Sequence, residues 1–313
     1  MKLVTATTTA GDLQFGTLRG ELDGWRLSLE AGNKSPRTVQ SYSETVEQLA
    51  DFLAAKGMPR SVENVKREHI EAWLRDMREA GRSEATIALR YRSLRVFWRF
   101  LADEEVVAVS PMAKMHSPKV SIQPTAIPPL EDVKKLLATT AGKDYEARRD
   151  RAILLLMVDS GARLSEVANI KLADVTFVGS RPDLVEITGK GGSRRTLVIK
   201  PVVAQAMRAY LRLRQDRRDA RLPWLWLGRG HLLPAGVAQM IGRRAEEAGL
   251  VGIHPHVFRH AFAHAWLAAG NSESALMRVA GWKSRSMLAR YGASLADERA
   301  REEHRGFSPT DLL

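Results

Sequence analysis

The sequence predicts a mainly α-helical protein of two domains, the second of which carries a small antiparallel β-sheet. The chain has 313 residues, more than one hydrophobic core usually holds. Apolar residues recur at helical spacing over most of its length, in windows that end at glycine or proline. Two β-branched runs, residues 184–188 and 196–199, flank a glycine-rich segment, which indicates a β-hairpin.

Composition and charge narrow the class of protein. The apolar fraction of 44% and the charged fraction of 27% are those of a globular chain. A net charge of +12 favours DNA or RNA as a partner, with a solvated basic surface as the alternative. Because the chain has no cysteine, disulfides, zinc–thiolate sites and cysteine nucleophiles are excluded. The longest apolar run, residues 152–158, is too short to cross a bilayer, so we expect a cytoplasmic protein with no membrane partner.

Four helices are expected in the first half of the chain. They are residues 15–31, a segment from Ser35–Pro36 to Gly57, a segment around residues 70–77, and residues 83–103. The fourth carries a narrow apolar stripe with a stripe of arginines beside it. These are Arg92, Arg95 and Arg99, which we expect to lack acidic partners at i+4. They are predicted to contact DNA phosphates, and a solvated charged face is the alternative.

The boundary between the domains is expected within residues 106–128. This segment contains four prolines and no helical period, which is typical of a linker. It separates a helical domain at residues 15–105, preceded by a polar leader at 1–14, from a second domain at 129–294 and a tail at 295–313. In the second domain we expect helices at residues 129–139, 152–158, 201–216, 234–248, 255–269 and 272–279.

Three basic sites in the second domain are poorly explained by folding alone. Arg163 lies close to the start of a helix that Ser165 is expected to cap, and the macrodipole disfavours a cation there. His256 and Arg259 share one face of the first turn of another helix. Lys190 lies at the tip of the predicted hairpin. A phosphate group would compensate all three sites together, although each alone is more often an ordinary surface cation.

The same segments contain partial matches to two other kinds of site, a metal site and a phosphate-binding loop. His256, His260 and His264 recur at i+4 and could ligate a metal. However, no glutamate of an HExxH motif lies between them and no cysteine is available, so we expect no metal site. The loop from Gly189 to Ser193 lacks the GxxxxGK spacing of a phosphate-binding P-loop.

An ordered series of motifs resembles the tyrosine recombinase family, also called phage integrases. The series is Gly-Ala-Arg-Leu-Ser-Glu ending at Glu166, Thr-Gly-Lys-Gly around Lys190, His-x-x-Arg-His ending at His260, Gly-Trp at Trp282, and finally Tyr291. The resemblance covers both halves of the chain. It implies a helical, SAM-like core-binding domain and a mixed α/β catalytic domain that clamp DNA from opposite sides.

The resemblance also implies a role for each motif residue. Arg163 and Arg259 would hold the scissile phosphate, and Tyr291 would be the nucleophile. Lys190 would be the general acid for the leaving oxygen, and His256 would assist proton transfer at the tyrosine. The remaining residues are Trp282, which would pack or hydrogen bond beside the phosphate, and Glu166 and His260, which would support the site. Many members of the family have histidine where this chain has Trp282, whose indole could only donate.

The reaction implied by the resemblance is site-specific recombination through a 3′-phosphotyrosine intermediate and a Holliday junction, without ATP or any cofactor. Its implied partners are double-stranded recombination sites, further copies of the chain in a tetramer on DNA, and accessory recombination factors. The tail at residues 295–313 resembles a segment that docks on a neighbouring subunit. Two alternatives remain: a type IB topoisomerase-like enzyme that relaxes DNA, and a non-catalytic DNA-binding regulator of the same fold.

Overall fold

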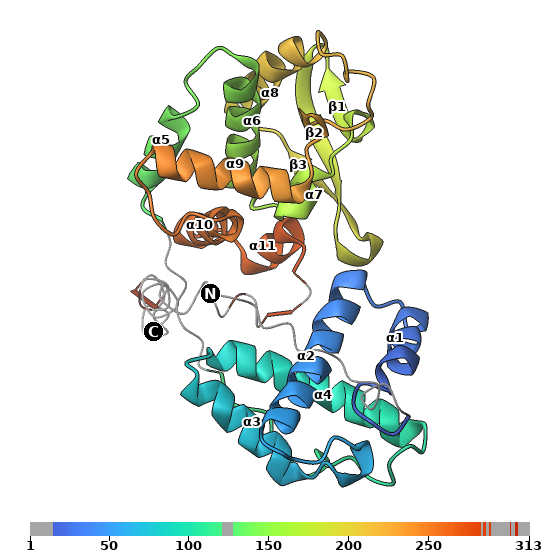
Figure 1. The fold of residues 1–313 in the computed structure, drawn as a ribbon. Coiled ribbons are helices and arrows are strands. Elements are labelled where there is room, and N and C mark those ends of the chain that lie inside the picture. Colours follow the sequence, from blue (N-terminus) through green and yellow to red (C-terminus); the bar gives the residue numbers. More distant parts are fainter. Residues whose placement is uncertain are drawn as a thin grey trace. The chain divides into compact units, whose positions relative to one another are not determined.

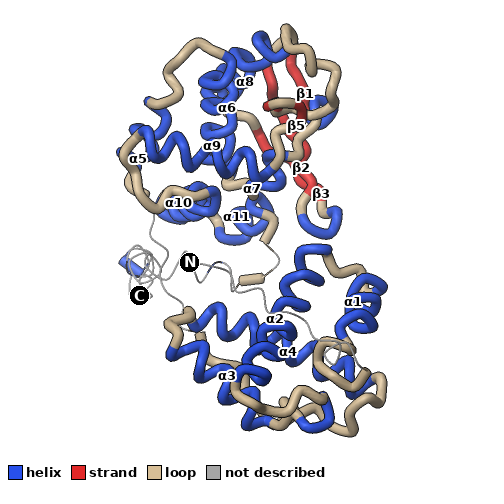
Figure 2. Tube along the Cα trace, in the orientation of Figure 1, coloured by secondary structure: helices blue, strands red, loops and turns tan. Residues whose placement is uncertain are grey.

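The computed structural model describes residues 15–120, 128–282, 284–285, 288, 301 and 304–305. The chain divides into two compact units, Met1–Ser121 and Ile122–Leu313, and the second contains a three-stranded sheet (Figure 1). The predicted fold class, mainly helical with a small antiparallel sheet, is confirmed (Figure 2). None of the helices in the described part of the chain is long and apolar enough to cross a membrane.

The first unit is a bundle of four helices. These are α1 (Leu22–Ala31), α2 (Pro36–Ala55), α3 (Arg67–Glu79) and α4 (Glu84–Asp103), with a 3-10 turn at Val62–Asn64. Two of them begin alike, because the hydroxyls of Ser35 and Ser83 accept hydrogen bonds from main-chain N–H groups three residues on. The expected first helix, residues 15–31, starts only at Leu22. Gly16 has a left-handed φ of 81° and its N–H donates to the Glu21 carboxylate, so the chain turns before it becomes helical.

The core of the first unit lies between α2 and α4 and is rich in aromatic side chains. Each residue of the predicted α4 stripe is buried: Ile87, Tyr91, Leu94, Trp98 and Leu101. Part of the expected linker also belongs to this core, since Val107, Met112 and Met115 are buried there. The Tyr91 hydroxyl donates to the Met115 carbonyl at 2.8 Å, which fixes the chain beyond α4. We therefore propose that the linker begins after Met115.

In the second unit, helices precede and follow the three strands of the sheet along the chain. Before the sheet come α5 (Leu130–Ala138), α6 (Tyr145–Ser160) and α7 (Leu164–Ala168). The strands are β1 (Val175–Val178), β2 (Arg181–Thr188) and β3 (Arg194–Val198), and 3-10 turns lie at Leu172–Asp174 and Lys190–Gly192. After the sheet come α8 (Pro201–Arg214), the short strands β4 (Leu227–Gly228) and β5 (Gly230–His231), α9 (Pro234–Glu247), α10 (Pro255–Ala268) and α11 (Glu273–Ala280).

The predicted hairpin is the β2–β3 pair, in which Val185 lies opposite Leu197 and Ile187 lies opposite Arg195. The strand β1 was not predicted, and it pairs antiparallel with β2 across a turn at Gly179. Inward-facing residues of β2 and β3 join α6, α8 and α9 in one apolar core. The hairpin therefore extends from a packed sheet, which gives the segment around Lys190 a fixed base.

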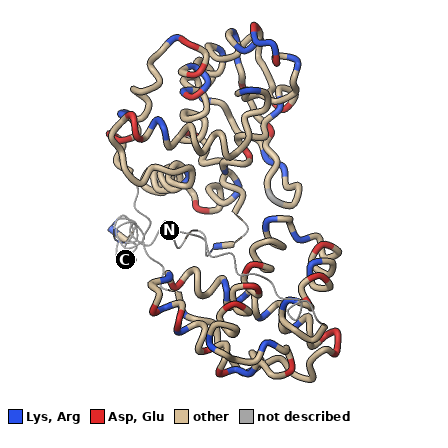
Figure 3. Tube along the Cα trace, viewed as in Figure 1, with Lys and Arg blue, Asp and Glu red and all other residues tan. Residues whose placement is uncertain are grey.

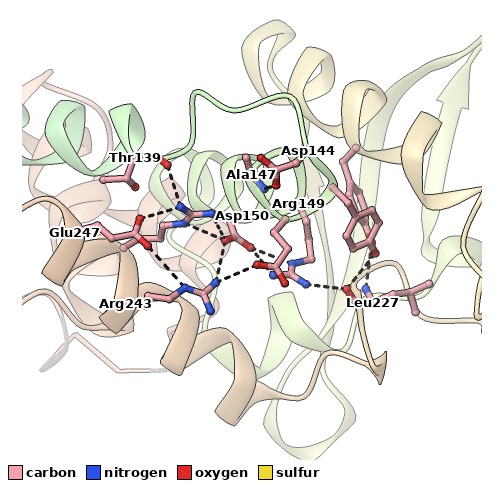
Figure 4. A network of polar contacts seen from close by, with 12 residues as sticks. Thr139, Asp144, Ala147, Arg149, Asp150, Leu227, Arg243 and Glu247 are labelled. Atoms are coloured by element: carbon pink, nitrogen blue, oxygen red, sulfur yellow. Dashed lines mark hydrogen bonds and ion pairs between the residues drawn. The ribbon is translucent and has the colours of Figure 1, made fainter.

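A buried charge network ties α5, α6 and α9 together (Figure 4). Asp150 on α6 is fully buried, and its two carboxylate oxygens accept from Arg149 at 2.8 Å and from Arg244 at 2.9 Å. Arg244 also donates to the Thr139 carbonyl at the end of α5, and Arg243 lies 3.5 Å from the same carboxylate. Because loss of one partner would leave a buried charge without compensation, this network fixes the helices that support α10 and α7.

Candidate active site

Arg163 is held where α6 ends and α7 begins. Gly161 ends α6 with a left-handed φ of 57°, and a Cβ added to it would lie 2.6 Å from the Phe262 ring, so only glycine fits. Arg163 is the N-cap residue of α7, and its N–H donates to Glu166 Oε2 at 2.7 Å. The expectation that Ser165 caps this helix is wrong, because Ser165 lies inside α7 and Glu166 caps its N-terminus.

Glu166 is a buried carboxylate that holds two guanidinium groups. It is 3% exposed, and its Oε1 accepts from Arg163 Nη1 at 2.8 Å. Arg195 on β3 donates from Nη1 to Oε1 at 2.9 Å and from Nη2 to Oε2 at 2.7 Å. Burial alone would raise the pKa of Glu166, but the hydrogen bonds from Arg195 and from the main chain of Arg163 outweigh it and lower that pKa. Arg163 is thus not the unpaired cation that its sequence position suggested, because it shares the Glu166 carboxylate with Arg195.

Three guanidinium groups meet at the C-terminus of α11. Arg195 Nε donates to the Val279 carbonyl at 2.8 Å, and Arg259 Nη2 donates to the Ala280 carbonyl at 2.6 Å. Arg163 Nη2 lies 3.4 Å from the Gly281 carbonyl. These are the last carbonyls of the helix, which lack partners within it and carry partial negative charge. The end of α11 therefore gathers cations from α7, β3 and α10 in one place.

Arg259 is buried within this cluster. Only 4% of it is exposed, and its Nη1 donates to the Gly161 carbonyl at 2.7 Å. The guanidinium carbon lies 5.2 Å from the centre of the Trp282 ring, and that ring is buried. Arg259 thereby joins the end of α6 to the end of α11. Arg163 differs in that 34% of its side chain stays exposed, so part of this guanidinium faces solvent.

His256 lies on the first turn of α10, within the field of the same cations. Partial burial of the ring lowers its pKa, and the charges of His254, Arg259 and Arg163 lower it further. The imidazole is therefore neutral at neutral pH, in which form one ring nitrogen can accept a proton. Arg163 and Arg259 thus meet at the end of α11, and His256 lies within the field of their charges, while the catalytic role of all three stays a prediction.

Comparison with known proteins assigns the family. Residues 129–298 match the phage integrase family, and residues 22–105 match the N-terminal SAM-like domain of phage integrases. The chain belongs to the phage integrase family. The tyrosine recombinase XerC of Oceanobacillus iheyensis is 29% identical over 262 residues, which cover 81% of this chain and 84% of that protein. XerC of Chromobacterium violaceum is 32% identical and covers 85% of this chain and 87% of its own.

A solved structure with a similar fold is a lambda integrase tetramer bound to a Holliday junction. It matches with a TM-score of 0.65 at 16% identity and covers 90% of this chain and 83% of its own. At this identity the likeness shows a shared fold. The likeness extends over the helical unit and the unit with the sheet of this phage integrase family member.

The hairpin that carries Lys190 reaches the same cluster through its main chain. A Cβ added to Gly189 would lie 3.0 Å from Glu166 Oε1, so the strand before Lys190 runs directly against the buried carboxylate. Gly191 and Gly192 have left-handed φ values and close the turn. Basic residues lie along the hairpin (Figure 3). The Lys190 side chain and all of Tyr291 lie outside the described residues, so their predicted roles stay predictions.

The remaining predicted residues are His260 on α10 and the three arginines of α4. His260 is half-buried one turn after His256 on α10. Within the described residues, no three histidine or acidic side chains are arranged to hold a metal ion. On α4, Arg92, Arg95 and Arg99 are exposed as expected. However, Arg99 lies 3.5 Å from Asp103, one turn further on, so the expectation that all three lack an acidic partner is wrong.

Arg195 is the residue of this cluster that the sequence did not single out. It alternates in phase with Leu197, which is buried on the inner face of β3. An arginine on the core side of a strand must find a buried acceptor, since an unpaired charge there is costly. The alternation of β3 could therefore have indicated that Arg195 faces inward. It was hard to recognise because Arg194, which faces outward, is also an arginine.

Proposed function

We propose that this protein is a site-specific DNA recombinase that cuts and rejoins strands through Tyr291. The observation that carries the proposal is the meeting of Arg163 and Arg259 at the end of α11, the helix that precedes Tyr291 in the chain, with His256 within the field of both charges. A tyrosine has an ordinary pKa of about 10, so at neutral pH it needs a base and nearby cations to become a nucleophile.

The chemistry follows from these residues. The Tyr291 oxygen attacks the phosphorus, its proton is taken up with the help of His256, and the bond to the 5′ oxygen breaks. Lys190 gives a proton to that oxygen, which leaves as a hydroxyl, and the enzyme keeps a 3′-phosphotyrosine. Arg163 and Arg259 stabilise the charge that develops on the phosphate, so no metal ion is needed.

The supporting residues hold this arrangement. Glu166 orients Arg163 through the 2.8 Å ion pair, and Trp282 packs against the guanidinium of Arg259. His260 supports the same helix face as His256. The 5′ hydroxyl of a second strand then attacks the phosphotyrosine, which rejoins DNA and frees Tyr291. Because the phosphoester bond is exchanged and not hydrolysed, ATP is unnecessary.

Two successive strand exchanges pass through a Holliday junction and involve four strands. The lambda integrase with a similar fold is a tetramer bound to such a junction, and we propose the same assembly here. The proposed partners are therefore double-stranded recombination sites and three further copies of the chain. Accessory recombination factors are additional partners, and the place of action is DNA in the cytoplasm.

Tyr291→Phe tests the proposal directly. We expect loss of the SDS-resistant protein–DNA adduct with little change in DNA affinity, because only one hydroxyl is removed. The adduct would be captured on fragmented genomic DNA, which also locates the target. Tyr42→Phe is the control, since it removes the hydroxyl of a half-buried tyrosine in the first unit and should leave the adduct unchanged.

The outcomes separate the rival functions. An undiminished adduct in Tyr291→Phe would show that another residue is the nucleophile. Relaxation of supercoiled DNA by the wild type with no recombinant product would favour a type IB topoisomerase-like enzyme. If Tyr291→Phe left every activity of the protein intact, a non-catalytic DNA-binding regulator would be the better description.

A further inference from the structure

One guanidinium group connects three segments of the proposed active site. Arg195 lies on β3, binds Glu166 of α7 through two nitrogens and binds the end of α11 through the third. We propose that Arg195 is a positioning residue that holds Arg163 and the Lys190 hairpin in register with the segment leading to Tyr291. This proposal rests on the proposed recombinase function and names a further residue required by it.

The link to Arg163 runs through Glu166. Arg195 engages both carboxylate oxygens, and only 12% of its side chain is exposed. A carboxylate that is held on both oxygens by a rigid fork cannot rotate, so the direction of Oε1 toward Arg163 Nη1 is fixed. The exposed part of Arg163, which would meet the phosphate, is thereby aimed by a residue that does not itself touch DNA.

The link to α11 is a close packing contact. Besides the bond from Arg195 Nε to the Val279 carbonyl, the guanidinium lies directly against Gly281. A Cβ added to Gly281 would fall 2.9 Å from Arg195 Nη1 and 3.2 Å from its Cζ. Gly281 also has a left-handed φ of 64°, so glycine is favoured there for two reasons. The end of α11, from which the chain continues toward Tyr291, therefore packs directly against Arg195.

The link to Lys190 runs along the hairpin. Arg195 lies opposite Ile187, and Gly189 comes two residues later, directly after the end of β2. Gly189 is pressed against Glu166, the carboxylate that Arg195 holds. The strand pairing and this contact fix the base of the hairpin at two points, so the turn at Lys190–Gly192 cannot tilt without breaking the bonds of Arg195.

Lysine cannot replace arginine in this role. Three acceptor atoms on two segments require a planar fork with a third N–H, whereas an ammonium offers one point of charge. Arg195→Lys keeps the charge beside Glu166 and loses the geometry. Arg194→Lys is the matched control, because the neighbouring Arg194 is exposed and its ion pair is with Glu186 at 3.1 Å on the outer face of the hairpin.

The test uses the genomic duplex captured by the wild type, synthesised with a nick beside the cleavage position so that the adduct accumulates. At saturating protein, we expect Arg195→Lys to slow adduct formation ~10- to 100-fold, the range for loss of a group that orients a reacting residue. DNA affinity should stay as in the wild type, and Arg194→Lys should cleave at the wild-type rate. A merely structural role would instead lower affinity and rate together.

A second measurement tests the link from Arg195 to Lys190. Sulfur in place of the 5′ bridging oxygen leaves as a thiolate, which needs no proton from Lys190. Part of the loss in Arg195→Lys should therefore be recovered on the sulfur substrate. Gly189→Ala is a second variant, since its φ of −92° tolerates alanine. The added methyl would lie 3.0 Å from both Glu166 Oε1 and Ser193 Oγ, so it presses the base of the hairpin away from Glu166 and shifts the Ser193 side chain. It should show the same loss of rate, the same affinity and the same recovery.

The outcomes distinguish this inference from the function on which it rests. A wild type that forms no adduct overturns both. A wild type that forms the Tyr291 adduct, with Arg195→Lys and Gly189→Ala as fast as Arg194→Lys, overturns the role of Arg195 alone. Slow cleavage that the sulfur substrate does not improve overturns the link to Lys190.

Discussion

At the scale of single residues, one carboxylate, that of Glu166, binds two arginines and fixes their positions. Glu166 satisfies Arg163 and Arg195, and in return both cations lower the pKa of Glu166 despite its burial. A buried carboxylate without such partners would be protonated or exposed instead. Arg259 is held differently, because it donates to the carbonyls of Gly161 and Ala280. The guanidinium groups of the cluster are therefore fixed by hydrogen bonds within the protein before any DNA binds.

His256 gives a prediction at this scale, because partial burial and, after it, nearby charges lower its pKa in the free protein. Partial burial of the ring contributes most and the charge of His254 is the next cause. A lowered pKa means that the neutral form persists to a lower pH than for an ordinary histidine, and proton uptake then begins only below the usual range near pH 6.5. His254→Asn should raise the pKa of His256 toward the ordinary value.

The measurement is an NMR titration of the His256 ring, together with the pH dependence of adduct formation. The acid limb of the rate should move to higher pH in His254→Asn, in step with the NMR titration. His116→Asn, an exposed histidine in the first unit, serves as the control and should move neither. A His256 that titrates at the same pH in all three proteins would contradict the prediction.

At the scale of elements, the site is built from helix ends. Glycines end α6 and α11 in left-handed conformations, a proline starts α10, and Glu166 caps α7. The C-terminal ends of α6 and α11 leave carbonyls without helical partners, and arginines of neighbouring elements bind those carbonyls. The same interactions that complete the helices therefore bring Arg163 and Arg259 together.

Gly161 gives a prediction at this scale. An alanine there must adopt a left-handed φ and must also displace the Phe262 ring, which lies 2.6 Å from the added Cβ. Gly179 takes a similar φ of 60° with nothing near its Cβ, so Gly179→Ala isolates the backbone cost of ~1–2 kcal/mol. Gly161→Ala should lower the free energy of unfolding by a further ~1–3 kcal/mol, the usual cost of overpacking. Urea unfolding of both variants measures the difference, and equal losses would show that Phe262 yields freely.

At the scale of the whole molecule, the sequence was most informative where a pattern is local. Glycine, proline and serine positions predicted most helix ends, and the α4 stripe predicted a core that Tyr91 and Trp98 occupy. The strand β1 was missed because four residues give little periodicity. The role of Glu166 as a shared acceptor, and the presence of Arg195 beside it, depend on contacts 29 residues apart in the chain, which no local pattern encodes. The charges of the site could be predicted, but their compensation could not.

The arginine stripe of α4 gives the last prediction, which concerns how the first unit binds DNA. Arg95 is exposed on α4, whereas Arg67 of the same unit is held by Glu71 at 2.7 Å. If Arg95 contacts a phosphate, Arg95→Ala should weaken binding to all DNA sequences alike and reduce the slope of log affinity against log salt by about one. Arg67→Ala should change the slope less, because its charge is already shared with a carboxylate. Binding titrations at several salt concentrations measure both, and an unchanged slope in Arg95→Ala would leave the stripe as a solvated face.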